Sequence, residues 1–287
     1  MLKSIDVVCP FNLNLFLNIR EKNQDNEISK LKLINQTVSM CDEIHDIVNI
    51  KKSRQGDFSI KVKENDKISK ENLNDIYKIA NLFFDYVNIK PENYIIDIKR
   101  NTKLMGLDLD DSIIAGVLIG LNYYCETNLT KRELLLLSSL VNPLISYFIV
   151  GGYNQVIGNN IEKLSKNPFN KYLIIDTSFK LQKDDISHEM GNHAIVLKSS
   201  KDNILYNDYL RVLPEELLRI KDFLSKYPDL AHSLSGLSST YFLAGYDNIP
   251  AKVMIDLKKH FPKYKLYQFQ NTSGHKILVK YVKNNLD

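Results

Sequence analysis

The stretch TKLMGLDLDDSIIAGVLIGLNYY, residues 102–124, decides how the rest of the chain is interpreted. Its second part, residues 112–124, is almost entirely apolar, which predicts a buried helix. Its first part places three carboxylates, Asp108, Asp110 and Asp111, directly before that helix. Acidic side chains near a helix N-terminus cap the helix and interact favourably with its dipole. The stretch therefore predicts an acidic loop that leads into a core helix.

Composition indicates an ordinary globular protein and excludes bulk disorder. The chain has 287 residues, of which 44% are hydrophobic and 25% charged, a length that suits two domains sharing an interface. Its 38 basic residues nearly balance 34 acidic ones, giving a net charge of +4. Such a weak excess does not indicate nucleic acid or an acidic membrane surface as a partner.

The cysteine content favours a reducing compartment. Cys9, Cys41 and Cys125 form no CxxC pair, and an odd number cannot all be paired within one chain. The N-terminal residues do not resemble a signal peptide. We therefore expect a cytoplasmic protein.

One uncharged stretch, LLLLSSLVNPLISYFIVGGY at residues 134–153, is long enough to span a bilayer as a helix. Three features argue against a membrane span. Asn142-Pro143 interrupts the helical hydrogen-bond ladder, the following ISYFIV suits a strand, and the flanks lack a strong basic bias. The pattern predicts a buried helix, a break and a buried strand, with no membrane contact.

Elsewhere, helical spacing and strand alternation predict a mixed α+β chain. Thr130 and Glu133 form a predicted capping box at the start of one helix. The polar stretch 159–170 predicts a boundary between a domain at 1–160 and one at 161–287. Predicted helices cover 73–87, 112–124, 130–140, 214–225 and 251–260, and predicted strands cover 4–8, 13–19, 33–50 (one or two strands), 58–62, 94–98, 171–175, 193–197, 240–245, 265–270 and 276–282.

Several short motifs, taken in order, resemble the GHMP superfamily of small-molecule kinases, and within it the CDP-methylerythritol kinases. CPFNLNLFL at residues 9–17 is similar to the family's first strand, APAKINLFL. FIVGG at 148–152 resembles FFLLGG, and SGLSST at 235–240 resembles the third motif, SGSGST. Further similar segments are QTVSMCDEI at 36–44, NDIYKIA at 74–80, GVLIGLN at 116–122 and NDYL at 207–210.

The resemblance covers nearly the whole chain and implies a two-domain GHMP-kinase fold. The first domain, 1–160, corresponds to the family's N-terminal kinase domain, and the second, 161–287, to its smaller ferredoxin-like C-terminal domain. The resemblance also implies ATP and Mg²⁺ as cofactors, and phosphorylation of a hydroxyl group on a CDP-linked polyol.

The phosphate loop departs from the family's glycine-rich pattern. Glycines let the loop backbone approach the ATP phosphates closely. Here only Gly106, Leu107 and Ser112 match, while Asp108, Leu109 and Asp110 replace the run of glycines and Asp111 replaces a serine. A carboxylate about 4 Å from a phosphate costs roughly 1 to 4 kcal/mol, and micromolar affinity is only about 8 kcal/mol. We expect impaired ATP binding.

Basic and acidic neighbours of the loop leave two alternatives open. Lys99, Arg100 and Lys103 are positioned in sequence to offset part of the negative charge, and Lys99 and Lys103 are candidate nucleotide contacts. In the third motif, Ser235, Gly236, Ser238 and Ser239 form either a small anion-binding turn or an ordinary connection. The carboxylates of Asp108, Asp110 and Asp111 could alternatively hold a cation by oxygen ligation.

The positions that carry catalysis in the family have also changed. Aligned through Gly151 and Gly152, Leu144 stands where the family has its catalytic Asp, with Asn142 two residues away. Asn12 stands where the first motif has its Lys. Neither Leu nor Asn is a general base or carries a positive charge. His45 is only a loose substitute for the family's substrate-recognising Tyr-His pair.

Three hypotheses follow. The chain is a pseudokinase that has lost phosphoryl transfer and acts as a ligand-binding or protein-interaction module. Alternatively, it is a divergent active kinase that uses ATP and Mg²⁺, with Asp108, Asp110 or Asp111 as base and Lys99 or Lys103 as the cation. A third hypothesis is nucleic-acid binding through residues 258–283, where seven lysines alternate with three tyrosines.

Overall fold

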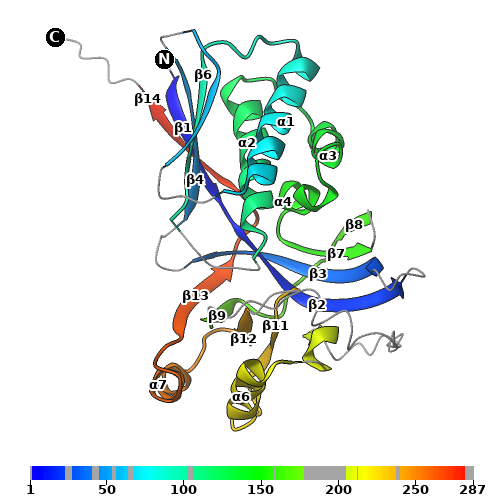
Figure 1. Cartoon of the computed structure of the whole chain (residues 1–287), viewed down its shortest axis with the longest axis vertical. Helices are drawn as coiled ribbons and strands as arrows, with labels where there is room; N and C mark the ends of the chain where they lie inside the picture. Colours follow the sequence, from blue (N-terminus) through cyan, green and yellow to red (C-terminus); the bar gives the residue numbers. More distant parts are fainter. Residues whose placement is uncertain are drawn as a thin grey trace, which may run out of the picture.

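The computed structural model describes residues 2–22, 28–40, 45–53, 56–63, 68–101, 107–157, 160–177, 205–211, 213–236 and 240–281. Within these ranges the chain forms two sheets, a five-stranded sheet above and a nine-stranded sheet below, each covered by helices (Figure 1). This architecture confirms the predicted α+β class.

The five-stranded sheet has the order β14-β1-β4-β6-β5. Its strands are β1 (Leu2–Cys9), β4 (Asp46–Lys52), β5 (Ser59–Val62), β6 (Tyr94–Lys99) and β14 (Lys276–Tyr281). The helical segments beside it are α1 (Lys70–Val87), α2 (Leu109–Tyr124), α3 (Lys131–Ser139), η1 (Pro143–Ile145) and α4 (Ser146–Val150).

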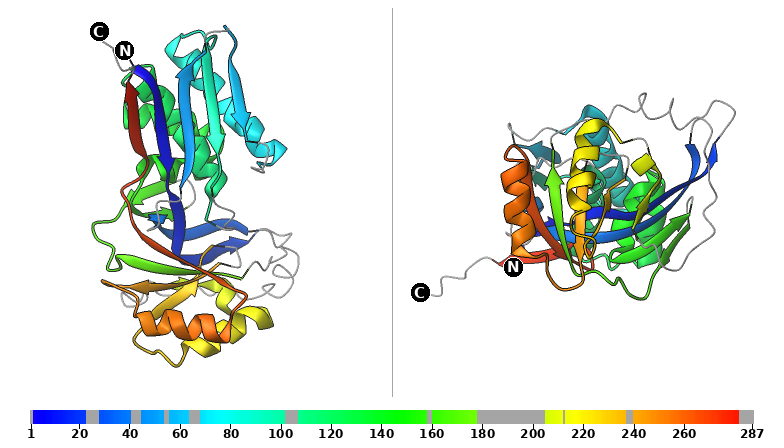
Figure 2. Two further views of the ribbon diagram at one scale, coloured as in Figure 1. Left: turned by 90° about the vertical axis from the view of Figure 1, so that its left-hand side faces the viewer. Right: turned by 90° about the horizontal axis from the view of Figure 1, so that it is seen from below.

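The nine-stranded sheet follows the order β10-β2-β3-β13-β9-β12-β11, with β7 and β8 added beside β3. Its strands are β2 (Phe11–Lys22), β3 (Ile28–Met40), β7 (Tyr153–Ile157), β8 (Asn160–Lys163), β9 (Lys171–Asp176), β10 (Tyr206–Asn207), β11 (Ala231–Leu234), β12 (Tyr241–Gly245) and β13 (Lys265–Asn271). The segments η2 (Asp208–Arg211), α6 (Glu215–Leu224) and α7 (Ala251–His260) complete this part, with α6 and α7 on the same side of the sheet (Figure 2).

Strand alternation divides the five-stranded sheet into an apolar and a polar face. Alternate residues of a strand point to opposite faces, and on one face the side chains are buried against α1 and α2. Gly120 of α2 lets the helix approach closely, because a Cβ there would be 2.6 Å from Ile50 Cδ1 and 2.8 Å from Val7 Cγ2. The opposite face carries Asp6 and Asn49, which are hydrogen-bonded to each other.

Two pairs of strands carry the chain between the sheets. β1 lies in the five-stranded sheet and β2, one residue later, lies in the nine-stranded sheet. On the return, β13 belongs to the lower sheet and β14 pairs with β1 (Figure 2). Strands from both sides of residue 160 therefore share each sheet, and the domain boundary predicted there stays a prediction.

The nine-stranded sheet contributes to apolar clusters on two sides. Side chains of α6 and α7 join the large core cluster, with Leu217, Ile220 and Leu257 almost fully buried. A separate cluster gathers around Phe11, Leu13 and Phe269, and it includes Leu107 and Leu109 from the start of α2. The acidic loop is thus attached to the lower sheet, while the helix that follows packs on the upper one.

The uncharged stretch at 134–153 forms two helical segments around a break. The capping box at Thr130 and Glu133 is confirmed, and so is the break before Pro143. The predicted strand is wrong. The Asn142 Oδ1 atom accepts a hydrogen bond from the Leu144 backbone at 3.0 Å and starts a new helical turn, and burial of Tyr147 and its neighbours outweighs their strand preference. Among the described residues, no helix is both long and apolar enough to cross a membrane.

Most other elements lie where the sequence predicts them. The apolar–polar run at 33–50 forms parts of two strands, β3 and β4, and β3 begins earlier, at Ile28. Cys9 and Cys125 are free thiols, whereas Cys41 lies outside the described residues. The strand predicted at 193–197 also lies outside them.

The paired glycines that end α4 provide a test of this packing. Both have positive φ, +64° at Gly151 and +72° at Gly152. A Cβ at Gly151 would be 2.1 Å from the Ser273 carbonyl oxygen, whereas at Gly152 the nearest atom, Cε of Lys163, is 3.9 Å away. We expect Gly152→Ala to lower the free energy of unfolding by about 1 kcal/mol and Gly151→Ala by more than about 3 kcal/mol, measured by urea denaturation. Equal losses would contradict the close approach of residues 151 and 273.

Candidate functional site at the start of helix α2

The N-terminus of α2 is fixed by two leucines and one backbone hydrogen bond. Leu107 is fully buried and Leu109 nearly so in the cluster on the nine-stranded sheet. The Asn12 backbone N–H of β2 donates to the Leu107 carbonyl at 3.0 Å. Asp108, between the two leucines, has φ 49° and ψ 43°. This left-handed conformation is one that glycine adopts without strain and that Asp tolerates better than most residues.

The Asp108 carboxylate contacts the amide that stands at the family's lysine position. Asn12 Nδ2 donates to Asp108 Oδ2 at 2.7 Å, and Asn12 is only 1% exposed. Burial raises the pKa of Asp108, and the hydrogen bond from Asn12 lowers it in part. Two residues that differ from the family pattern, Asn12 on β2 and Asp108 in the loop, are thus hydrogen-bonded to each other.

Asp111 lies beside Asn142, close to the position of the family's catalytic Asp. Asn142 Nδ2 donates to Asp111 Oδ1 at 3.1 Å. Burial, with repulsion from Asp108, Asp110 and Asp75, raises the pKa of Asp111 to about 7. Burial, again with the charges of Asp108 and Asp111, also raises the pKa of the Tyr147 hydroxyl. The side chain of Leu144 is 44% exposed.

The third carboxylate, Asp110, is held in an ion pair. Arg100 Nη2 lies 2.9 Å from Asp110 Oδ1, and the Asn72 side chain donates to the other carboxylate oxygen. Arg100 Nε also lies 3.8 Å from Asp46 Oδ2. The three loop carboxylates therefore turn to three different sets of partners. No group of three His, Cys, Asp or Glu residues that could hold a metal ion occurs in the described part of the chain, which leaves the metal hypothesis for these carboxylates without support.

Ser112, the last residue of the degenerate loop, faces the junction between β1 and β2. Its hydroxyl donates to the Pro10 carbonyl at 2.5 Å, and its own carbonyl accepts from His275 Nε2 at 2.8 Å. Burial lowers the pKa of His275 to about 4, although the bond to Ser112 acts in the opposite direction. His275 was missed by sequence reasoning, because 163 residues separate it from its partner and it belongs to no motif.

The turn of the third motif lies against the same strand as Asp108. The buried Ser235 Oγ accepts from the Asn14 backbone at 3.1 Å. Gly236 has φ +58°, and a Cβ there would be 2.6 Å from Asn14 Oδ1. Asn12 and Asn14, two residues apart on β2, point to the same face. The loop and the third motif therefore contact neighbouring positions of one strand, β2, whereas Ser238 and Ser239 lie outside the described residues.

The predicted basic contacts are placed differently. Lys99 ends β6 on the polar face of the five-stranded sheet, opposite the face that α2 covers. Arg100, the next residue, is the cation that reaches the loop. Lys103 and Gly106 lie outside the described residues. The His45 carbonyl accepts a hydrogen bond from the Asn101 side chain.

The basic residues of 258–283 are divided between separate parts of the fold. β13 and β14 belong to different sheets. Lys280 forms an ion pair with Asp6, and the Tyr264 hydroxyl donates to Glu216. Residues 282 and 283 lie outside the described range. The basic residues of this segment thus lie on strands of two sheets, and the nucleic-acid hypothesis stays a prediction.

Comparisons with known proteins point to one superfamily. The chain is 30% identical over 254 residues to the 4-diphosphocytidyl-2-C-methyl-D-erythritol kinase of Clostridium tetani, covering 80% of this chain and 87% of that one. It is 28% identical over 217 residues to the enzyme of the same name from Prochlorococcus marinus, covering 71% and 66%. A comparison with models of protein families finds no match.

Solved structures confirm the fold. The homoserine kinase of Cytophaga hutchinsonii has a TM-score of 0.70 at 14% identity, covering 97% of this chain and 98% of that one. A 4-(cytidine 5'-diphospho)-2C-methyl-D-erythritol kinase has a TM-score of 0.65 at 15% identity, covering 93% and 100%. These similarities confirm the GHMP-kinase fold that the motifs predicted.

The Asp111 environment predicts an unusual pH dependence of stability. A carboxyl group whose pKa rises from 3.8 to about 7 on folding favours the folded state only while it is protonated. The free energy of unfolding should therefore fall as pH rises from about 4 to about 7, by up to a few kcal/mol at ~1.4 kcal/mol per pKa unit. Asp111→Asn should flatten this dependence and be more stable than the natural chain at pH 8, measured by urea denaturation.

The matched control is Asp85→Asn on the exposed face of α1, which should leave the pH dependence unchanged. A natural chain whose stability rises between pH 4 and 7, with no difference in the Asp111→Asn variant, would contradict the crowded environment of this carboxyl group.

Proposed function

The chain belongs to the family of 4-diphosphocytidyl-2-C-methyl-D-erythritol kinases in the GHMP superfamily, and on that premise we propose that it is a pseudokinase. In this proposal it keeps the kinase fold, binds ATP weakly or not at all, and does not transfer a phosphoryl group. It acts instead through binding, as a small-molecule-binding or protein-interaction module. The contact between Asp108 and Asn12 carries the proposal.

The residues at the start of α2 do not fit the phosphates of a nucleoside triphosphate. A phosphate site needs backbone N–H groups and positive charge facing the anion. Here Asp108 and Asp111 present carboxylates at that helix start, and Asn12 and Asn142 offer neutral amides that already donate to them. At about 4 kcal/mol per close carboxylate–phosphate contact in a partly buried site, two such contacts would offset micromolar affinity.

The described residues also offer little for the chemical step at the family's positions. Catalysis of phosphoryl transfer rests on positioning and on stabilising charge. The side chain of Leu144 has no titratable group, and Asn12 cannot supply the charge of the family's lysine. The one cation that reaches the loop, within the described residues, is Arg100, and it is paired with Asp110 and close to Asp46.

One observation favours a second candidate, a divergent active kinase. The pKa of Asp111, raised to about 7, is the value that a general base needs near neutral pH. Its neighbour Asn142 stands close to the family's catalytic position. In this alternative Asp111 deprotonates the hydroxyl group of a CDP-linked polyol, with ATP and Mg²⁺ as cofactors.

Calorimetry with Mg-ATP tests the pseudokinase proposal. We expect no heat of binding for the natural chain up to millimolar nucleotide. Asp108→Gly removes one carboxylate and returns the residue best suited to φ 49°, so this variant should bind Mg-ATP at least about tenfold more tightly than the natural chain. A clear micromolar affinity of the natural chain would overturn the proposal.

A phosphorylation assay with CDP-methylerythritol distinguishes the two candidates. The pseudokinase should give no product above the background without protein. Turnover by the natural chain that is lost in Asp111→Asn and kept in Asp85→Asn would establish the divergent kinase instead. The assay should be run at pH 8, where the Asp111 carboxyl group is mostly ionised and best able to act as a base.

A further inference from the structure

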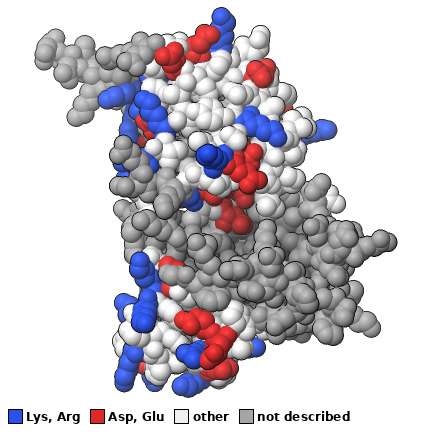
Figure 3. All heavy atoms as spheres, viewed as in Figure 1, with Lys and Arg blue, Asp and Glu red and all other residues white. Residues whose placement is uncertain are grey.

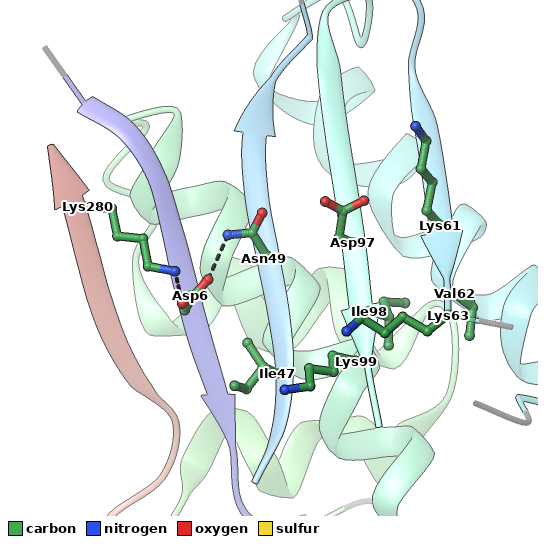
Figure 4. Close-up of a pocket in the computed structure, with 10 residues that line it drawn as sticks. All are labelled: Asp6, Ile47, Asn49, Lys61, Val62, Lys63, Asp97, Ile98, Lys99 and Lys280. Carbon is green, nitrogen blue, oxygen red and sulfur yellow. Dashed lines mark hydrogen bonds and ion pairs between the residues drawn. The ribbon is translucent and has the colours of Figure 1, made fainter. Parts of the chain in front are cut away.

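The polar face of the five-stranded sheet contains a groove that is separate from the site at α2. The groove has a volume of about 620 Å³ and is lined by residues of β1, β4, β5, β6 and β14 and by Lys63, directly after β5. Its lining combines the half-buried Ile47 side chain with lysines (Figure 4), whereas the side chain of Ile98, at 1% exposure, belongs to the core on the other face. The helices cover the other face of this sheet, so the groove opens away from them (Figure 1).

The charges in the groove leave an excess of lysine. Its two carboxylates are both neutralised, Asp6 by Lys280 and Asp97 by Lys51. Lys61, Lys63 and Lys99 form no ion pair with any residue that the structure describes. In the space-filling view, Lys and Arg residues, with some Asp and Glu between them, mark the upper left edge of the molecule, on the side of the uncovered sheet (Figure 3).

Two of these lysines point in the same direction. In Figure 4, the side chains of Lys63 and Lys99 extend across the sheet toward Ile47, while Lys61 points toward the opposite end of β5. The ammonium groups of Lys63 and Lys99 therefore extend toward Ile47, which is half-buried on this face. This arrangement offers two positive charges next to one apolar side chain.

We propose that this groove binds a small phosphorylated organic molecule, with its phosphate held by Lys63 and Lys99 and its carbon skeleton on Ile47. Lysine ammonium groups bind phosphates as point charges. The volume lies within the range of small-molecule sites, about 300 to 1,000 Å³. A nucleic acid fits less well, because its affinity depends on roughly six to ten phosphate contacts along an extended track. Here the neighbouring lysines, Lys280 and Lys51, are already in ion pairs with Asp6 and Asp97.

The site can be tested with inorganic pyrophosphate and a sugar phosphate as probes, titrated at low salt into the full chain with labelled isoleucine methyl groups. We expect saturable NMR shifts at Ile47 with both probes. The sugar phosphate should also give direct contacts to the Ile47 methyl groups in NOE spectra. The double variant Lys63→Gln/Lys99→Gln should weaken binding by at least about tenfold, as expected from losing two charge contacts.

The matched control removes two exposed lysines from the last turn of α7, in Lys258→Gln/Lys259→Gln, and should bind both probes within about twofold of the natural chain. Unchanged affinity in the groove variant, equal loss in the control, or shifts confined to other isoleucines would overturn the proposal. Tighter binding of a short oligonucleotide than of the sugar phosphate, at equal phosphate concentration and with the same methyl shifts, would assign the groove to nucleic acid instead.

Discussion

The hydrogen bond from the Asn12 backbone to the Leu107 carbonyl fixes where α2 begins against β2. Burial of Leu107 and Leu109 on both sides of Asp108 prevents the loop from moving aside, because exposing two leucines costs about 1.5 to 3 kcal/mol each. Asp108 is therefore held in a left-handed conformation with its carboxylate facing Asn12. This attachment determines the electrostatics of the site, because it places the Asp108 carboxylate at the N-terminus of α2.

Once these carboxylates are fixed at the helix start, their neighbours determine what else can approach. The helix dipole favours negative charge at this end, and Asp108 and Asp111 already supply it. Their partners are the neutral amides of Asn12 and Asn142, whereas the cation Arg100 is turned toward Asp110 and Asp46. The negative charge of Asp108 and Asp111 is consequently shared through hydrogen bonds and is not cancelled. Burial, with added repulsion from the neighbouring carboxylates, raises the pKa of Asp111, and the same carboxylates make the helix start unfavourable for a phosphate.

More of the fold than of the candidate site could be predicted from the sequence. Apolar spacing located α1 and α2, the Thr130 capping box located α3, and the order of motifs identified the superfamily. The helix α4 could not be predicted locally, because its β-branched and aromatic residues favour a strand and only burial reverses that preference. The partners of the site residues were equally hidden, since Arg100 with Asp110 and His275 with Ser112 meet only through the fold. The placement of Lys99 did have a signal, because the alternation in YIIDIK puts it on the same face as Asp97 and opposite to the buried Ile98.

This alternation also explains how one chain can repel an anion at one place and attract it at another. The near balance of 38 basic and 34 acidic residues gives no strong overall field. Helix α2 and the groove lie on opposite sides of the five-stranded sheet, and charges separated by more than about 8 to 10 Å are largely screened at physiological salt. Each place is therefore governed by its own neighbours, carboxylates at the helix and Lys63 with Lys99 in the groove. Under the two proposals, a phosphorylated molecule meets repulsion at the start of α2 and attraction on the uncovered face, so the proposed loss of phosphoryl transfer does not imply loss of phosphate recognition by the chain as a whole.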